Sequence, residues 1–370
     1  MSNPSVNAVN SYAAAGVDVE AGERAVALMR AAVQSTQRPE SVGNFGGFAG
    51  LFDASALARY RKPLLATSTD GVGTKVAIAQ ALQRYDTIGI DLVAMIVDDL
   101  VVCGAEPLFL TDYIATGSVV PERIAAIVSG IAEGCRQAGC ALLGGETAEH
   151  PGLMAPDEFD LAGAGTGVVE ADDLLGPERV QIGDRLIAMA ASGLHANGYS
   201  LARAILLGTN GPGLSAQPDG LPATLGELLL EPTRIYAKDC LSLAATGGVH
   251  AFSHITGGGL AANIARVLPE HCTAVVDRAS WAMPPLVRYL GECGAVTDAE
   301  LERTFNMGIG MVAVVPSSQG AAALDLLGAR GLQAWICGEV REREPGDHSD
   351  GAPKGGQGGA AQLTGNYATR

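Results

Sequence analysis

The sequence predicts an α+β fold with two domains, each a sandwich of strands and helices. The chain has 370 residues, which is enough for two domains of roughly 150 residues each. Apolar residues make up 48% of it, so each domain can bury a core. Segments typical of strands and of helices follow one another without strict βαβ alternation. This order favours two α+β sandwiches over a doubly wound parallel sheet.

In the first half, we expect helices over residues 21–33, soon after 75, and over 87–102. Strands are expected at 63–68, 108–114, 140–145 and 160–170. The helix after Pro121 has the clearest pattern, because proline is tolerated in a first helical turn and apolar residues then recur with helical spacing. Gly139 is expected to end it.

The second half repeats this mixture from a predicted strand that begins at Asp184. Helices are expected from Tyr199, over 233–245, from Leu260, over 281–290 and from Gln319. Strands are expected at AFSH, TAVVDR, GMVAVV and AWICGEV. We therefore place the N-terminal domain at 1–175 and the C-terminal domain at 176–342. The Gly-rich stretch 343–370 is expected to be disordered.

Charge and apolar patterning exclude several classes of protein. The formal net charge is −16, which argues against nucleic acid and against anionic membrane surfaces as partners. No apolar run approaches the roughly 18 residues that span a bilayer, and the N-terminus lacks the pattern of a secretory signal. Seven scattered cysteines fit reduced thiols in the cytoplasm.

The segment STDGVGTK, residues 68–75, ends a predicted strand and contains the first polar cluster. Gly71 and Gly73 allow backbone N–H groups, with that of Thr74, to converge on an anion. Lys75 offers a positive charge for a phosphoryl oxygen, and Asp70 is a suitable oxygen ligand for Mg²⁺. A tight turn with a solvated lysine is the alternative, and this segment alone fits both.

Asp98 and Asp99 form a second cluster within an apolar segment. Adjacent carboxylates are costly to bury unless they are paired or bind a metal. A helix whose aspartates reach solvent is the alternative.

Three more clusters lie at predicted element ends. They are GGET with Glu146, SGLHANGY with His195 and Asn197, and HITGGG, residues 254–259. The last precedes a helix, whose N-terminus can bind an anion. Each segment also fits an ordinary turn or surface. Together, the five clusters predict a site for a phosphate group and a divalent metal ion.

These clusters resemble one family, the aminoimidazole ribonucleotide synthetases, also called phosphoribosylformylglycinamidine cyclo-ligases. Eight segments agree in order and spacing: TDGVGTK, DTIGIDLVAM, DLVVCGAEPLF, GGETAE, SGLHANGYSL, PTRIYAK, HITGGG and TFNMGIGM. The resemblance covers about residues 11–340 and leaves out the Gly-rich tail.

The resemblance implies an enzyme of de novo purine biosynthesis. The expected reaction is ATP-dependent cyclisation of formylglycinamidine ribonucleotide to aminoimidazole ribonucleotide, through phosphorylation of the amide oxygen, with release of ADP and phosphate. Mg²⁺ is implied, with K⁺ as an additional ion in many members. The family also implies a cytoplasmic homodimer, in which the N-terminal mixed sheets form a barrel-like core beside C-terminal α/β sandwiches.

The same resemblance implies roles for individual residues. Asp70 and Asp99 are expected to ligate Mg²⁺, with Asp98 as an alternative ligand, and Lys75 to contact phosphate. The residues expected near ATP are Gly43, Gly46, Gly47, Gly71, Gly73, Thr74 and Asp112, the first three in a loop that closes over the nucleotide. Those expected to hold the ribonucleotide are Glu146, Asn197, Thr256, Gly257 and Gly258. His195 and His254 are expected to be catalytic.

The chain departs from the family pattern at two places: it has Asp98 where the family usually has asparagine, and the bulkier Asn44-Phe45 in the glycine loop. Three relatives with similar folds are alternatives. Selenophosphate synthetase needs a cysteine and a lysine near the N-terminus, and hydrogenase-maturation relatives need a C-terminal cysteine; this chain has neither. Thiamine-phosphate kinase lacks the PTRIYAK and HITGGG pair. A catalytically dead nucleotide-binding regulator is a further alternative; it should have lost the metal-binding carboxylates or the lysine, and this chain has all of them.

Overall fold

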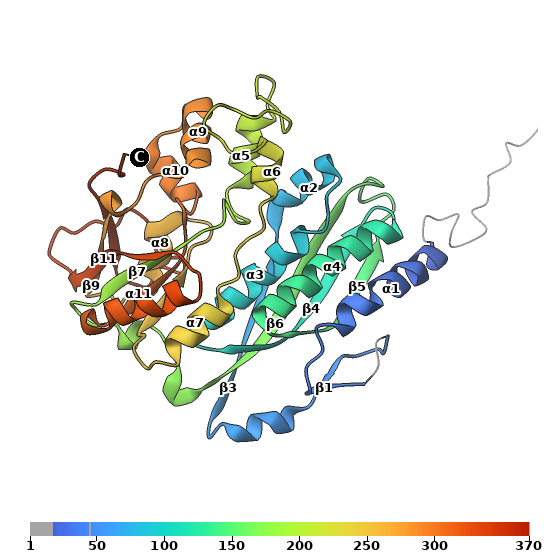
Figure 1. Cartoon of the computed structure of the whole chain (residues 1–370), viewed down its shortest axis with the longest axis horizontal. Helices are drawn as coiled ribbons and strands as arrows, with labels where there is room; N and C mark the ends of the chain where they lie inside the picture. The colour runs from blue at the N-terminus through green and yellow to red at the C-terminus, as the bar shows by residue number, and fades with distance from the viewer. Residues whose placement is uncertain (1–17, 44–45, 370) are drawn as a thin grey trace, which may run out of the picture.

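The computed structural model describes residues 18–43 and 46–369 and confirms the predicted α+β class. One sheet has four strands in the order β3-β6-β4-β5, and a second has six in the order β12-β9-β11-β7-β10-β8. Both sheets are mixed, because β4 runs parallel to β5 and β12 parallel to β9, whereas the other pairs are antiparallel. The two parts lie side by side (Figure 1).

The N-terminal part holds the four-stranded sheet under α3 and α4, with α1 packed along α4 (Figure 1). Its strands are β3 (Pro63–Gly71), β4 (Glu106–Thr116), β5 (Ala141–Glu149) and β6 (Phe159–Glu170), with the short pair β1 (Ser41–Val42) and β2 (Leu51–Phe52). Its helices are α1 (Val19–Gln34), α2 (Val76–Leu82), α3 (Ile88–Val101) and α4 (Pro121–Ala138). As predicted, α4 begins with Pro121 in its first turn and ends at Gly139, which is left-handed at φ 82°.

The C-terminal part is built on the six-stranded sheet. Its strands are β7 (Arg185–Ala190), β8 (Ala251–His254), β9 (Cys272–Asp277), β10 (Ile309–Val315), β11 (Ala334–Glu342) and β12 (Ala360–Thr364). Its helices are α5 (Tyr199–Leu206), α6 (Leu225–Leu230), α7 (Ala237–Ala244), α8 (Gly259–Arg266), α9 (Pro285–Gly294), α10 (Asp298–Thr304) and α11 (Gly320–Ala329).

The core is continuous between the two parts. Side chains alternate across β7, as in any strand: Ile187 and Met189 join a large core shared with α3 and α4, whereas Leu186 and Ala188 face a second core under α8. The C-terminal sheet is therefore buried on both faces, and α3 lies at the boundary between the parts.

One face of the N-terminal sheet remains open. The glycines of β6 face α3: a Cβ on Gly163 would lie 2.9 Å from the Ile96 side chain. Strand residues that alternate with these rows point away from the helices. Among them, Leu65 on β3 is 64% exposed and Tyr113 on β4 is 40% exposed. A sheet face with exposed apolar side chains is typical of an association surface.

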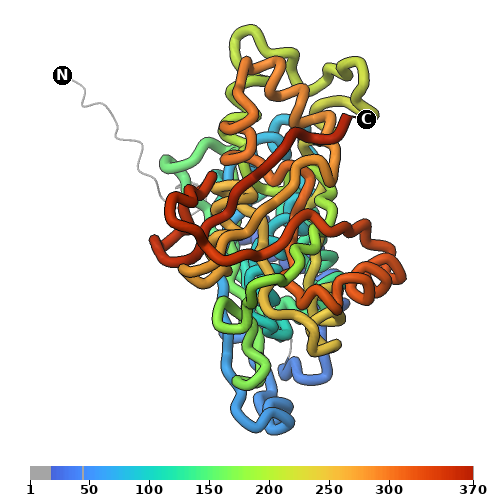
Figure 2. Tube along the Cα trace, turned by 90° about the vertical axis from the view of Figure 1, so that its left-hand side faces the viewer, coloured from blue at the N-terminus to red at the C-terminus, as the bar shows by residue number. Residues whose placement is uncertain are grey.

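The C-terminal segment differs from expectation, because residues 343–370 were predicted to be disordered. Residues 360–364 instead form β12, which pairs in parallel with β9. Ala360 and Ala361 are fully buried, and Asp347 accepts hydrogen bonds from Arg341. In Figure 2 this segment, in red, crosses the face of the C-terminal part. Short, small side chains hid the strand from periodicity, and its partner lies far away in the sequence.

Candidate active site

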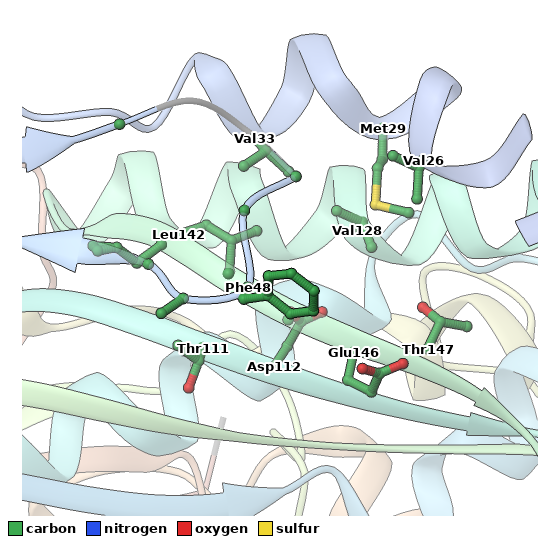
Figure 3. A pocket seen from close by; sticks show the side chains of 18 of the residues that line it. Val26, Met29, Val33, Phe48, Thr111, Asp112, Val128, Leu142, Glu146 and Thr147 are labelled. Carbon is green, nitrogen blue, oxygen red and sulfur yellow. The ribbon is translucent and has the colours of Figure 1, made fainter. Parts of the chain in front are cut away.

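A cavity of about 840 Å³ opens between α1, α4 and the β4–β5 side of the N-terminal sheet (Figure 3). Gly43, Gly46 and Gly47 line it, as does Phe48, so the predicted glycine loop does border a ligand-sized space. Asn44 and Phe45 lie outside the described residues. Four polar strand residues border it, Thr111, Asp112, Glu146 and Thr147. Of these, Asp112 and Thr147 lie on the helix-covered face by register, whereas Thr111 and Glu146 lie on the opposite face. Apolar walls with a few polar groups are typical of small-molecule sites.

Asp112 is the most perturbed group of this cavity, because burial raises the pKa of its carboxyl to about 7. The Asp112 side chain fits beside the neighbouring strand β5 because residue 145 of that strand is a glycine. A Cβ on Gly145 would lie 1.7 Å from Asp112 Oδ1, which is far inside van der Waals contact. A side chain at position 145 would therefore displace the carboxylate.

Register places Asp70 and Asp112 in one row of the sheet. Asp70 on β3 is opposite Gly163 on β6, and Gly163 is opposite Asp112 on β4. Directly opposed residues point to the same face, so both carboxylates lie on the helix-covered side. Two strand spacings separate them, or about 10 Å. The loop cavity and the end of β3 thus belong to one continuous side of the sheet.

Beyond β3, four titratable groups gather between the two parts of the molecule. His254, at the end of β8, has Nδ1 2.9 Å from Asp99 Oδ1, and its Nε2 is buried without a partner. Burial lowers the pKa of His254, but the hydrogen bond to Asp99 and the charges of Asp98, Asp99 and Asp70 raise it by more. The imidazole is therefore biased towards the charged form.

Asp70 belongs to this group through its charge interactions. Burial raises the pKa of its carboxyl, the Gly71 N–H lowers it and the Asp99 charge raises it; the net shift is upward. His254 and Lys354 act in the opposite direction. Asp70 is therefore the point at which groups from both parts of the molecule meet.

Asp98 and Asp99 have different environments. The Asp98 side chain is fully buried, accepts the Tyr236 N–H at 2.9 Å, and leaves Oδ2 without a partner. Burial raises its pKa to about 7. The Asp99 side chain is 44% exposed. Only Asp99 is open to a solvated metal ion, while Asp98 connects α3 to the chain before α7.

The predicted substrate residues lie beside this group. Asn197 Oδ1 accepts the Gly257 N–H at 3.0 Å, so the SGLHANGY and HITGGG segments are joined. Gly258 is left-handed at φ 101° and precedes α8, whose first turn has no side-chain cap. Thr256 contacts Asn263, within α8, at 3.4 Å. The N-terminus of an eight-residue helix thus faces the boundary between the parts.

His195 is held differently from His254. It is 1% exposed and takes a left-handed conformation at φ 62°, which is uncommon for a residue with a side chain. Its Nε2 accepts a long hydrogen bond from the Ser192 N–H at 3.3 Å. Burial lowers its pKa well below the usual range. His195 is therefore a neutral, buried group.

Lys75 is not free to contact a phosphate, contrary to expectation. Its Nζ is fully buried and donates to Asp91 Oδ1 at 2.8 Å, to the His195 carbonyl at 3.0 Å and to the Glu231 carbonyl at 2.7 Å. A lysine has three N–H donors, and all three are used. Sequence reasoning missed Asp91, although a carboxylate within an apolar helix signals a buried partner.

Thr74 and Glu146 occupy more peripheral positions. Thr74 Oγ1 lies 3.3 Å from Ser200 Oγ on α5, a contact between the two parts. Glu146 is exposed on the edge strand β5 and borders the 840 Å³ cavity rather than the Asp99–His254 pair. The structure thus divides the predicted residues into a loop cavity and a group between the parts.

The donor set between the parts is compatible with Mg²⁺ that a phosphate helps to bind. Within residues 18–43 and 46–369, no three carboxylate, imidazole or thiol groups form a complete metal cage. Mg²⁺ does not need one, because it is usually held by one or two carboxylates plus substrate phosphates and water. Asp70 and Asp99 supply two such carboxylates.

Comparisons with known proteins cover nearly the whole chain. Residues 52–169 match the family model of the AIR synthase related protein, N-terminal domain, and residues 181–349 match that of the C-terminal domain. A phosphoribosylformylglycinamidine cyclo-ligase from Geobacillus kaustophilus is 52% identical over 89% of this chain and 95% of that protein. One from Geobacter sulfurreducens is 49% identical over 91% and 96%.

Solved structures with this fold are more distant in sequence. A thiamine-monophosphate kinase from Stenotrophomonas maltophilia has a TM-score of 0.63 at 21% identity, over 91% of this chain and 95% of that one. HypE from E. coli, a hydrogenase maturation protein, has 0.61 at 21%, over 91% and 93%. A HypE in complex with ATP has 0.58 at 19%, over 87% and 86%.

At such identities these structures show the fold alone, whereas relatives that are half identical over nine tenths of the chain show the family. No helix in the described part of the chain is long and apolar enough to cross a membrane. The chain belongs to the phosphoribosylformylglycinamidine cyclo-ligase family, built from the two AIR synthase related domains.

Proposed function

We propose that this protein closes the imidazole ring of aminoimidazole ribonucleotide from formylglycinamidine ribonucleotide, with conversion of ATP to ADP and phosphate. The observation that carries the proposal is the identity of about half over nine tenths of the chain to proteins named for this reaction. The loop cavity would hold ATP, and the group formed by Asp70, Asp98, Asp99 and His254 would lie where the two chemical steps take place.

The chemistry requires activation of an oxygen. An amide oxygen is a poor leaving group, so the γ-phosphoryl group of ATP is first transferred to it: the bond to the β-phosphate oxygen breaks, a P–O bond to the amide oxygen forms, and ADP leaves. The nearby amine then attacks the carbon, the C–O bond breaks, phosphate leaves and the nitrogen loses a proton. Positioning and charge neutralisation dominate phosphoryl transfer.

The loop cavity is the proposed ATP site. Its volume of about 840 Å³ lies within the range of roughly 300–1,000 Å³ of ligand pockets. Gly43, Gly46 and Gly47 border it on the loop side and Asp112 on the strand side. A HypE with the same fold has been solved in complex with ATP, which supports ATP as a ligand of this chain. Gly71, Gly73 and Thr74, at the end of β3, would lie towards the phosphates.

Asp70 and Asp99 are the proposed Mg²⁺ ligands, because their charges interact and the Asp99 side chain is accessible. The ion would neutralise charge on the phosphoryl oxygens during transfer. Asp98 is proposed as a positioning residue, since its exposed fraction is zero and Tyr236 already donates to it. K⁺ would be a further activating ion.

The C-terminal part is the proposed ribonucleotide side. Asn197, Thr256, Gly257 and Gly258 would orient the substrate at the α8 N-terminus, with Glu146 as a further contact. His254 is the proposed group for stabilising charge or moving a proton at its free Nε2, because Asp99 holds the opposite nitrogen. His195, neutral and buried, would position the segment around Asn197.

We also propose a dimer interface, a domain boundary and a cellular location. The open face of the four-stranded sheet, with Leu65 and Tyr113 exposed, is proposed to join that of a second copy as a barrel-like homodimer core. The domains are proposed to divide near residue 175, between β6 and β7. A cytoplasmic location agrees with the enzyme class.

An assay of ADP release tests the function. Purified protein with ATP and Mg²⁺ should release ADP only when formylglycinamidine ribonucleotide is added, at one ADP for each aminoimidazole ribonucleotide formed. ADP release that ignores the ribonucleotide, or none at all, would refute the proposal. Thiamine monophosphate in place of the ribonucleotide is the control for the fold neighbour's substrate.

A further inference from the structure

The connection between β11 and β12 forms an arch over α8. On one side, Gly351 packs so closely on α8 that a Cβ there would lie 2.5 Å from the Ala262 nitrogen. On the other, the Gly359 N–H donates to the Ala265 and Leu268 carbonyls, both at 3.0 Å. The tip of the arch, residues 352–357, lies beyond the C-terminal family model, which ends at residue 349. Figure 2 shows this red segment on the surface of the C-terminal part.

The tip of the arch brings Lys354 to the start of α8. Its Nζ lies 4.0 Å from the position that a Cβ would take on Gly257. Its charge also acts on the Asp70 carboxyl, which belongs to the other part of the molecule. Among the described residues, no hydrogen-bond or ion-pair partner lies within contact distance of the Lys354 ammonium. An ammonium is therefore presented to the mouth of the proposed site with its donors unused.

The charge balance of the mouth explains why a cation is needed there. Asp70 and Asp99 place two carboxyl groups close enough for their charges to interact, and the whole chain carries a formal charge of −16. Like charges in a partly desolvated cleft repel strongly. The buried, unpartnered His254 Nε2 and the α8 N-terminus favour an anion, and Lys354 adds a full positive charge on the open side.

We propose that Lys354 binds a phosphate-type oxyanion of the reactants between the α8 N-terminus and Asp70. This inference rests on the proposed function. Two groups share the required chemistry, the 5′-phosphate of the ribonucleotide and the γ-phosphoryl group of ATP. Lys354 is not placed in either chemical step, so the loss should appear in the KM for the reactant that it contacts.

The test measures kcat and KM for each reactant with the other saturating, in wild type, Lys354→Ala and Lys354→Arg. Gln357→Ala, an exposed change in the same tip, is the matched control. A charge-assisted contact of this kind corresponds to about tenfold in KM. We expect Lys354→Ala to raise one KM about tenfold and to leave kcat within twofold of wild type. Lys354→Arg keeps the positive charge, so its KM should lie close to the wild-type value. Gln357→Ala should match wild type in both constants.

The affected KM identifies the contact: a rise for the ribonucleotide indicates its 5′-phosphate, and a rise for ATP indicates the γ-phosphoryl group. Both KM values within twofold of wild type would overturn the inference. So would an altered Mg²⁺ requirement alone, which would make Lys354 a partner of Asp70. Equal effects of Gln357→Ala would point to the loop and not to the charge. If wild type itself shows no ribonucleotide-dependent ADP release, the proposed function fails instead.

Discussion

Replacing Lys75 by methionine should lower the free energy of unfolding, because it weakens the junction between the two parts. It should not raise the KM for ATP directly, because Lys75 is not expected to contact the nucleotide. The change preserves side-chain length and removes three donors, those to Asp91, to the His195 carbonyl and to the Glu231 carbonyl. Both partners of the ion pair have exposed side-chain fractions of 0%, so water cannot replace the ammonium.

The expected loss of unfolding free energy depends on the buried Asp91 carboxylate, which would remain without its charged partner. Burial lowers the pKa of Lys75 and raises that of Asp91, and their mutual attraction opposes both shifts. Removing one partner of a buried ion pair costs about 3–5 kcal/mol, because the remaining charge is uncompensated. Thr233 still donates two hydrogen bonds to Asp91 Oδ1, which places the expected loss of unfolding free energy near the lower limit, about 3 kcal/mol.

Denaturant unfolding of wild type, Lys75→Met, Asp91→Asn and the double variant measures this loss, with exposed Lys62→Met as the control. The double variant should lose less than the sum of the two single changes, because the unpaired carboxylate is gone. A Lys75→Met protein within 1 kcal/mol of wild type (roughly the error expected of such a comparison) but with a greatly raised KM for ATP would refute the reasoning and restore Lys75 as a phosphate ligand.

Three further changes test the site. Gly145→Ala should displace Asp112 and so raise the KM for ATP at least about tenfold, a cost of roughly 1.4 kcal/mol. Gly144→Ala is the control, because its Cβ would meet nothing within 4 Å, and it should match wild type. Equal kinetics for both variants would show that Asp112 has no role in ATP binding. Asp112→Asn should stabilise the ligand-free protein at pH 8 and not at pH 4: the folded-state pKa is raised from 3.8 to about 7, so ionisation between these values costs stability, at most about 4 kcal/mol. Thermal unfolding at the two pH values checks this, and an equal change at both would contradict it. Asp99→Asn should raise the Mg²⁺ concentration for half-maximal activity more than Asp98→Asn does; the reverse order would make Asp98 the ligand.

Local patterns in the sequence predicted most elements of the fold. The α4 helix was predicted because Pro121, the apolar spacing and Gly139 are all local signals, and the structure agrees within a residue at each end. By contrast, α6 (Leu225–Leu230) was missed, since six residues in a Gly- and Pro-rich region carry too little periodicity. The β12 strand was missed because its pairing with β9 is a long-range contact.

For the candidate site, local patterns singled out polar residues but not the partners that these residues have in the folded chain. HITGGG contacts Asp99 through His254 and contacts SGLHANGY through the Gly257 N–H, whereas the phosphate and metal site predicted from these clusters stays a prediction. Lys75 shows the limit of such reasoning: its three acceptors lie 16, 120 and 156 residues away, and only the folded chain shows that they use all of its donors. Lys354 lies in the segment that was predicted to be disordered, so no role was predicted for it.

The central claim is that ATP activates the amide oxygen of the ribonucleotide for ring closure. The most direct measurement uses formylglycinamidine ribonucleotide labelled with ¹⁸O in its formyl group, followed by mass spectrometry of the phosphate released. Because the C–O bond breaks only after phosphorylation of that oxygen, the account predicts one ¹⁸O atom in each phosphate. Unlabelled phosphate formed at the same rate as aminoimidazole ribonucleotide would contradict it.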